Sequence, residues 1–354
     1  MKSLHGMAVV LATALALVGC SPAPQVRPQV RADGGHHPPC LANLPAPWRA
    51  PSTVGMAFIR GGSFQAGAKP MRREEGPPRL TRVSSFWIDR TDVTNAQFAR
   101  FVAATGYVTL AEKPLEPRAY PGLSGDQLKP SGIVFVGSDR PAGSDPSAWW
   151  RVEPGADWRH PQGPATSIDG QETLPVVQIA WDDAVAYAHW LGRDLPTEAE
   201  WEYAAQGGKG ATRFVWGDAP LDPKHPQANV WQGVFPALDI GEDGFKAEIS
   251  PVGCFPANGY GLYDMAGNVW QWTKDWYQPD PSSGSSREGP TQIAALDPGD
   301  PGARKHVIKG GSFLCSPNYC YRYRPAARQA GPTDTGENHI GFRTVLRISA
   351  RPGD

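Results

Sequence analysis

The sequence lacks an excess of charge of either sign. Its 34 Lys and Arg residues nearly balance 35 Asp and Glu residues, which gives a formal net charge of -1 at pH 7. It also has no long basic run. Because binding to nucleic-acid phosphates normally requires a basic surface, nucleic acid is not an expected partner.

Long apolar runs are absent beyond the first residues, so no later segment is expected to span a bilayer. The chain has 40% hydrophobic residues and 13 Trp among 354 residues, which is enough for a large core. Its 40 Gly and 37 Pro interrupt regular elements often. We therefore expect one irregular, loop-rich α+β domain over residues 55–349, with little regular secondary structure.

The N-terminal 20 residues have the pattern of a secretory signal. Lys2 precedes the apolar stretch Met7–Val18, and Gly19 and Cys20 follow it. The end of this run resembles the bacterial lipoprotein cleavage box, in which the Cys becomes the first mature residue and carries acyl chains. An ordinary cleaved signal with an incidental Cys20 is the alternative.

Residues 21–54 are rich in Pro and have no apolar period, which predicts an extended tether. We expect an exported protein at the periplasmic face of the cell envelope that contacts the membrane through its lipid anchor only. Ser21 after Cys20 favours the outer membrane over the inner one.

Helix signals occur in three places. Two are capping boxes, in which a Thr and a Gln or Glu three residues later bond to each other's backbone N–H groups. Beyond Gly207 we expect short strands only, such as Lys305–Ile308 and Cys320–Arg324. The predicted helices are Thr94–Gly106, Trp181–Leu191, and a stretch after Pro196 that opens with Thr197 and Glu200.

Cysteine is scarce, with five residues in the chain. If Cys20 carries the anchor, four thiols remain in an oxidising compartment, and they allow three pairings: they are Cys40, Cys254, Cys315 and Cys320. A turn at Ser316–Asn318 separates the last two and can bring their sulfurs face to face. Such a pair could form a structural disulfide or an exchangeable one, or it could hold Cu(I) as two thiolates.

Spacing and compartment alone favour the structural disulfide, since Cys pairs of secreted proteins usually have that role. The surroundings add another interpretation. If Cys320–Arg324 is a strand, one thiol shares a face with Arg322 and Arg324, and nearby cations lower a thiol pKa. Ordinary ion pairing of both arginines with acidic loops is the alternative.

The run GGSFLCSPNYCYRYRPAAR, together with Ile340–Arg343, resembles the active-site signature of the formylglycine-generating enzyme (sulfatase-modifying factor) family. Runs such as LPTEAEWEYAAQGG and NGYGLYDMAGNVWQW resemble the same family, and the resemblance covers nearly all of Gly55–Ile348. Non-oxidising relatives share the general domain, so the C-x4-C pair is the discriminating part. The resemblance implies the family's fold, which is similar to that of C-type lectins.

The family's reaction oxidises a cysteine in a Cys-x-Pro-x-Arg segment of an unfolded sulfatase polypeptide to formylglycine, with O2 and a reductant. The resemblance implies that Cys315 and Cys320 bind Cu(I) and leave a position for the substrate thiolate. It also assigns catalytic positions beside the oxygen pocket to Ser312, Trp270 and Tyr319. We expect this copper-dependent oxidase to be a monomer.

The resemblance further implies two structural calcium sites, for which mixed carbonyl and carboxylate oxygens are suitable ligands. In the second site Gln271 replaces the usual glutamate, and Asp264 stands where a neutral amide can stand. The matching positions are Asn229, Val230, Asp243 and Phe245 for the first site, and Asp264, Gly267, Val269 and Gln271 for the second.

Other features depart from the family pattern. Pro325 and Thr344 occupy positions where secreted animal relatives have disulfide cysteines, so Cys254 has no such partner. His339 stands where relatives contact the substrate with asparagine, which indicates a different peptide preference.

The alternative function is a non-catalytic or differently acting lipoprotein of the same domain class, with a structural Cys315–Cys320 disulfide. An iron-dependent sulfoxide synthase is disfavoured, because residues 21–90 do not form the helical, histidine-rich module that such an enzyme needs.

Overall fold

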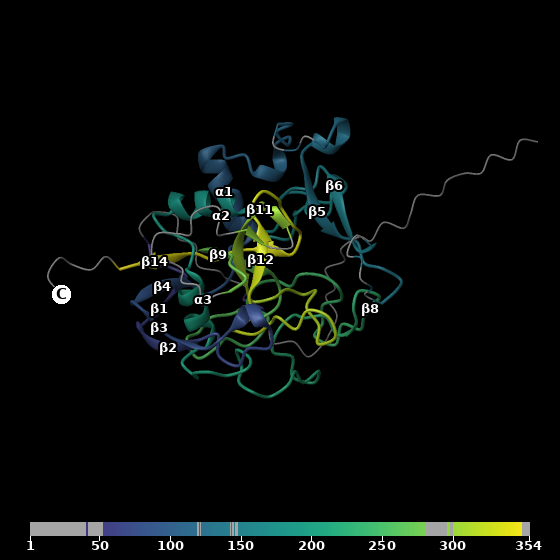
Figure 1. Ribbon diagram of the computed structural model, residues 1–354. Coiled ribbons are helices and arrows are strands. Elements are labelled where there is room, and N and C mark those ends of the chain that lie inside the picture. The colour runs from purple at the N-terminus through teal and green to yellow at the C-terminus, as the bar shows by residue number, and fades with distance from the viewer. Residues whose placement is uncertain are drawn as a thin grey trace, which may run out of the picture. The chain divides into compact units, whose positions relative to one another are not determined.

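The computed structural model describes residues 40–41, 52–280, 296–297 and 300–348, apart from positions 119, 121, 142, 144, 146 and 147 (Figure 1). The predicted signal and nearly all of the predicted tether lie outside these residues, so both stay predictions. Within the described ranges, no helix combines the length and the apolar character needed to cross a bilayer.

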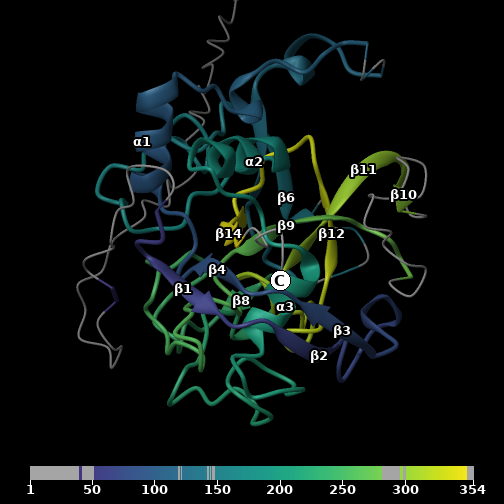
Figure 2. The same ribbon diagram turned by 90° about the vertical axis from the view of Figure 1, so that its left-hand side faces the viewer.

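The three α-helices of the described part form where the capping signals predict them. The Thr94 side chain accepts the Gln97 N–H at 3.4 Å, and Gly106 ends the first helix with a φ of 68°. A ring stack between Phe98 and Tyr187, with centroids 5.9 Å apart, packs the first two helices together (Figure 2). The helices are α1 (Asn95–Thr105), α2 (Trp181–Trp190) and α3 (Glu198–Ala205), and short 3-10 turns cover Arg73–Glu75, Leu110–Glu112 and Gly125–Leu128.

The strands are short and form small sheets, as expected for a Gly- and Pro-rich chain. They are β1 (Met56–Ile59), β2 (Gly62–Ala66), β3 (Arg79–Val83), β4 (Phe86–Asp89), β5 (Ser131–Phe135), β6 (Trp150–Pro154), β7 (Gly233–Val234), β8 (Leu238–Asp239), β9 (Trp270–Trp276), β10 (Leu296–Asp297), β11 (Asp300–Lys309), β12 (Gln329–Pro332), β13 (Ile340–Gly341) and β14 (Val345–Arg347). The predicted strand Lys305–Ile308 is confirmed, because it lies within β11.

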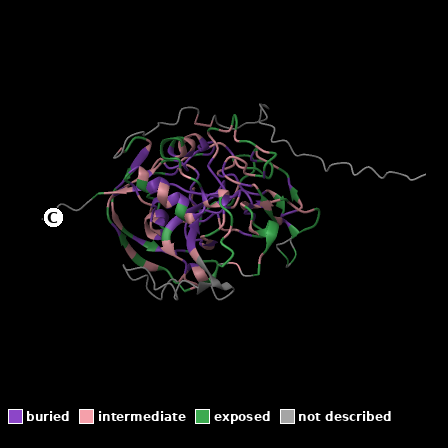
Figure 3. Cartoon of the chain, turned by 90° about the horizontal axis from the view of Figure 1, so that it is seen from above, coloured by how far each residue is buried: buried purple, intermediate pink, exposed green. Residues whose placement is uncertain are grey.

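One sheet brings together the segments that carry the predicted site. Its order is β10-β11-β9-β13, and β12 also pairs with β11. Lys309 at the end of β11 lies opposite Gln271 of β9, and Ile340 of β13 lies opposite Trp270. Buried residues occupy the interior around this sheet (Figure 3). The chain therefore enters the loop with the two cysteines directly from the buried sheet.

The predicted strand Cys320–Arg324 is wrong. Tyr321 has a φ of 48°, a left-handed conformation that interrupts an extended chain. The Tyr321 carbonyl instead accepts a hydrogen bond from Arg324 Nε at 2.8 Å. Side chains in this segment therefore do not alternate between two faces.

Cys40 and Cys254 are joined by a disulfide. The next residue, Leu41, packs against Gly253, where an added Cβ would lie 2.6 Å from the Leu41 side chain. The prediction that placed Cys40 in a free tether and left Cys254 without a partner is therefore corrected. Local composition does not show the pairing, because the partners are 214 positions apart.

We expect this disulfide to stabilise the domain by about 2–5 kcal/mol, since it restricts a long loop of the unfolded chain. Cys254→Ser should lower the midpoint of thermal unfolding. The control is Cys315→Ser, which opens a disulfide with a sequence separation of only 5 and should cost less. A Cys254→Ser midpoint equal to that of the wild type would contradict the expectation.

Candidate active site

The two predicted site cysteines lie together in the loop that follows β11. Gly310 and Gly311 begin this loop with φ values of 96° and 72°, which suit glycine. Cys315 and Cys320 form a disulfide, with their Cα atoms 4.7 Å apart. The Tyr321 N–H donates to the Ser316 carbonyl at 2.9 Å, which closes the turn between them. The turn thus brings the two sulfurs together, as predicted.

Both cysteines are buried, with exposed fractions of 2% and 7%. Ser312 is also buried; its carbonyl accepts the Cys315 N–H at 2.9 Å, and its hydroxyl oxygen accepts the Leu314 N–H at 3.3 Å. Trp270 belongs to the same buried cluster as both cysteines. The structure therefore groups these four predicted residues in one water-poor region.

Tyr319 differs from the other predicted catalytic residues because it reaches the surface. Its exposed fraction is 41%, and its ring stacks on Phe235 with centroids 4.2 Å apart. Burial of the rest of the ring raises the pKa of the Tyr319 phenol, so the phenol stays neutral at ordinary pH. Tyr319 can therefore contact both solvent and the cysteine loop.

The arginines after Cys320 are ion-paired. Arg322 contacts Glu74 at 3.0 Å. Both guanidinium nitrogens of Arg324 bond to Glu75, one of them at 2.9 Å, and this pair is buried. The prediction that two guanidiniums share a face with the thiol is thus replaced by its alternative, ion pairing with an acidic loop. Their charges are compensated before they can act on a thiolate.

The partner loop at residues 72–75 was missed by the sequence analysis. Burial favours the neutral form of Glu75, but hydrogen bonds from Arg324 and from the Met71 N–H outweigh it and lower its pKa. Arg72 also donates to the Cys320 carbonyl at 3.3 Å. Two adjacent Glu residues were the only local sign of this role.

The first predicted calcium set gathers around one buried carboxylate. Asp243 accepts the N–H groups of Val230 and Phe245, at 3.0 and 3.1 Å. The Asn229 amide lies nearby and donates to the Glu248 carbonyl at 3.0 Å. Burial raises the pKa of Asp243 to about 7. A bound cation would offset this cost of burying a carboxylate, so the set fits a hard ion.

The second predicted set does not fit as a whole. The Gln271 side-chain oxygen already accepts hydrogen bonds from Trp201 at 2.6 Å and from Arg343 at 2.8 Å. Both of its lone pairs are therefore in use, and one donor is a cation. Asp264 accepts the Gly253 N–H at 2.7 Å through one oxygen, and its other oxygen has no partner among the described residues. Asp264 can thus accept a further donor or a cation, whereas Gln271 cannot.

The remaining two predicted positions of the second set, Gly267 and Val269, lie between Asp264 and Gln271. Gly267 has a φ of 72°, and a Cβ there would lie 2.1 Å from the Asn229 carbonyl oxygen. Only glycine fits at this close approach. The loop therefore joins the two predicted calcium sets, whatever their occupancy.

His339 is buried close to Trp150, with ring centroids 4.8 Å apart. Its Nδ1 lies 3.3 Å from a Glu337 carboxyl oxygen. Burial lowers the pKa of His339 to about 3 and raises that of Glu337 to about 7. The imidazole is therefore neutral at neutral pH. Glu337 was not among the predicted residues.

Comparisons with known proteins agree with this arrangement. A family model described as a sulfatase-modifying factor enzyme 1-like domain matches residues 42–348. The formylglycine-generating enzyme of Mycobacterium tuberculosis is 49% identical over 293 residues, which cover 81% of this chain and 96% of that protein. The enzyme of the same name from Thermomonospora curvata is 44% identical over 312 residues, covering 84% and 95%.

Among solved structures, PvdO from Pseudomonas aeruginosa is similar to this chain with a TM-score of 0.55 at 22% identity, covering 87% of this chain and 100% of that one. This likeness concerns the fold alone and confirms the predicted mixed, loop-rich fold of C-type-lectin-like type. The matched family model spans most of the sequence, and the relatives align over most of their own length. The chain therefore belongs to the formylglycine-generating enzyme (sulfatase-modifying factor) family.

Proposed function

We propose that this protein oxidises a cysteine in a Cys-x-Pro-x-Arg segment of a sulfatase to formylglycine. The observation that carries the proposal is the buried pair Cys315 and Cys320, placed beside Ser312 and Trp270 in a chain of this family. O2 is the proposed oxidant, and a reductant supplies the remaining electrons. The substrate is an unfolded polypeptide, because a buried pair is not accessible to a cysteine held within a folded domain.

Cu(I) is the proposed cofactor, and Cys315 and Cys320 are the residues that would hold it. When bound, this soft ion supplies O2 activation and a position for the substrate thiolate. Two electrons and two protons must first convert the disulfide to two thiols. The Cα separation of 4.7 Å then allows both sulfurs to reach one ion. Ser312 offers a hydroxyl donor, and Trp270 excludes water.

A second candidate function is a non-catalytic or differently acting member of the family. The disulfide between Cys315 and Cys320 and the ion-paired arginines favour it, because no free cation stabilises a thiolate there. Counting reactive thiols in the native protein after mild reduction separates the two candidates. The oxidase requires a reducible pair, whereas a structural disulfide resists the reductant.

The oxidase predicts that copper-loaded protein with a reductant converts a Cys-x-Pro-x-Arg peptide to its aldehyde, with O2 uptake. Cys315→Ser and Cys320→Ser should each lower kcat by about a thousandfold or more, since each removes half of the sulfur pair. Cys254→Ser serves as the control and should keep its activity. Wild-type protein that binds copper and forms no aldehyde would sink the proposal.

Calcium is also a proposal, and the geometry supports it at the first set. We expect one tightly bound Ca2+ per chain, measured by atomic emission after dialysis, and none in Asp243→Asn. Chelation should lower the thermal midpoint of the wild type but not that of the variant. Two ions per chain would show that the second set also binds, despite the engaged oxygen of Gln271.

We further propose export and acylation at Cys20, with residues 21–54 as a tether apart from the linked Cys40. The wild type should fractionate with membranes, and its N-terminal peptide should carry the mass of acyl chains. Cys20→Ser should lack this mass and remain outside the membrane fraction. An unmodified N-terminus in the wild type would contradict the anchor.

A further inference from the structure

Several exposed apolar side chains surround Tyr319. Single exposed apolar residues are ordinary on protein surfaces, but a group beside a candidate site indicates an interaction surface. We call this group the apolar rim: Val136, Val234, Leu238, Ile240 and Tyr319, with exposed fractions of 47%, 42%, 50%, 50% and 41%.

The rim is continuous because its members share one buried aromatic support. Tyr319 stacks on Phe235, and Phe235 stacks on Phe135 with centroids 5.8 Å apart. Val136 directly follows Phe135, and Val234 directly precedes Phe235. Val234 also lies opposite Leu238 in the β7–β8 ribbon. These contacts join segments that are far apart in the sequence.

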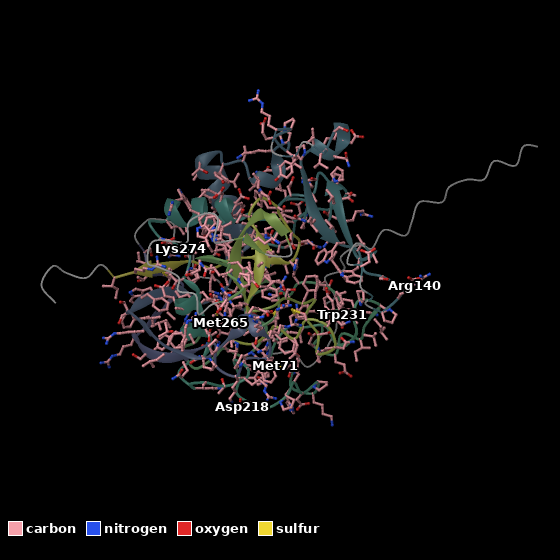
Figure 4. The ribbon with its side chains drawn as sticks, in the orientation of Figure 1. Met71, Arg140, Asp218, Trp231, Met265 and Lys274 are labelled. Atoms are coloured by element: carbon pink, nitrogen blue, oxygen red, sulfur yellow. A yellow bond between two sulfur atoms is a disulfide. The ribbon has the colours of Figure 1, made fainter. Side chains whose placement is uncertain are left out.

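The same support reaches the cysteine pair. The Trp231 N–H donates to the Cys315 carbonyl at 3.0 Å, and the Trp231 indole N–H donates to the Leu238 carbonyl at 3.0 Å. Trp231 lies on the side of the molecule that carries β8 (Figure 4). One side chain thus connects the candidate site with the rim.

The loop between the cysteines reaches the surface only at residues 317–319, and Tyr319 is the apolar member of that stretch. A polypeptide whose cysteine approaches the pair along this exposed stretch meets the rim. An unfolded chain exposes the apolar side chains that its folded form buries. A small ribbon bordered by apolar side chains suits an extended segment of this kind.

We propose that the apolar rim binds the part of the unfolded substrate that flanks the oxidised cysteine, through apolar side chains at positions outside the Cys-x-Pro-x-Arg motif. This inference rests on the proposed function, because it takes the occupant to be the polypeptide whose cysteine reaches Cys315 and Cys320. The rim therefore selects among sulfatases by the apolar residues next to their motif.

The test uses two peptides with the same Cys-x-Pro-x-Arg core, one flanked by Leu and Phe and the other by Ser and Gly. Fluorescence anisotropy measures their binding to copper-free protein, so the result does not depend on turnover. The wild type should bind the apolar peptide roughly tenfold more tightly, as expected for burial of one or two apolar side chains.

The double variant Val234→Ser/Leu238→Ser should lose this preference and bind the polar peptide as the wild type does. Its matched control is Phe58→Ser/Leu80→Ser, which changes side chains that are 48% and 74% exposed on β1 and β3. The control should keep the preference. Thermal unfolding should show that both double variants are folded.

Equal binding of the two peptides by the wild type would overturn the inference, whereas turnover of the polar peptide would still support the oxidase. Vesicles of phosphatidylethanolamine and phosphatidylglycerol test a lipid occupant, and sedimentation tests a second copy of the chain. If the rim variant weakens vesicle binding or self-association and leaves the peptide preference intact, the rim serves that occupant instead.

Discussion

A buried ionic network holds the cysteine loop at both of its ends. Lys309, at the end of β11, is fully buried and lies 3.4 Å from Glu202. Beyond the loop, Arg328 contacts Glu198 at 2.7 Å and Arg324 contacts Glu75. Removing one partner of a buried pair leaves an uncompensated charge, which costs about 3–5 kcal/mol. The loop therefore has one arrangement in which all these charges are satisfied.

This network also determines what the arginines can do for the thiols. Burial raises the pKa of Glu198, but Arg328 and Lys309 outweigh it and bring the value to about 2. The acidic partners are thus ionised and compensate the nearby cations. Activation of Cys315 and Cys320 must then come from reduction and from a bound ion rather than from unpaired guanidiniums. The arginines position the loop, and the sulfurs carry the chemistry.

Long-range polar contacts perform the same function elsewhere in this loop-rich domain. Gly253 donates to Asp264, and its neighbour Cys254 is bonded to Cys40. Gln271 accepts from Trp201 and Arg343, which come from α3 and from the segment after β13. Irregular segments have few ladder hydrogen bonds, so side chains and one disulfide fix their positions. The apolar rim is placed in the same way, by Trp231.

The sequence by itself determined the features that depend on neighbours within a few positions. Thr94 and Gln97 form their capping box through hydrogen bonds within one helical turn, and a turn between Cys315 and Cys320 joins them. The family motif predicted the fold, because it preserves many such local patterns together.

Only the tertiary structure decided the remaining features. Arg324 meets Glu75 across 249 positions, and Cys40 meets Cys254 across 214. The left-handed backbone at Tyr321 and the engaged oxygen of Gln271 likewise follow from how distant segments pack. The physical reason is that pairing of buried charges, sulfurs and amides depends on which surfaces meet after the chain folds, and residue type alone does not encode it.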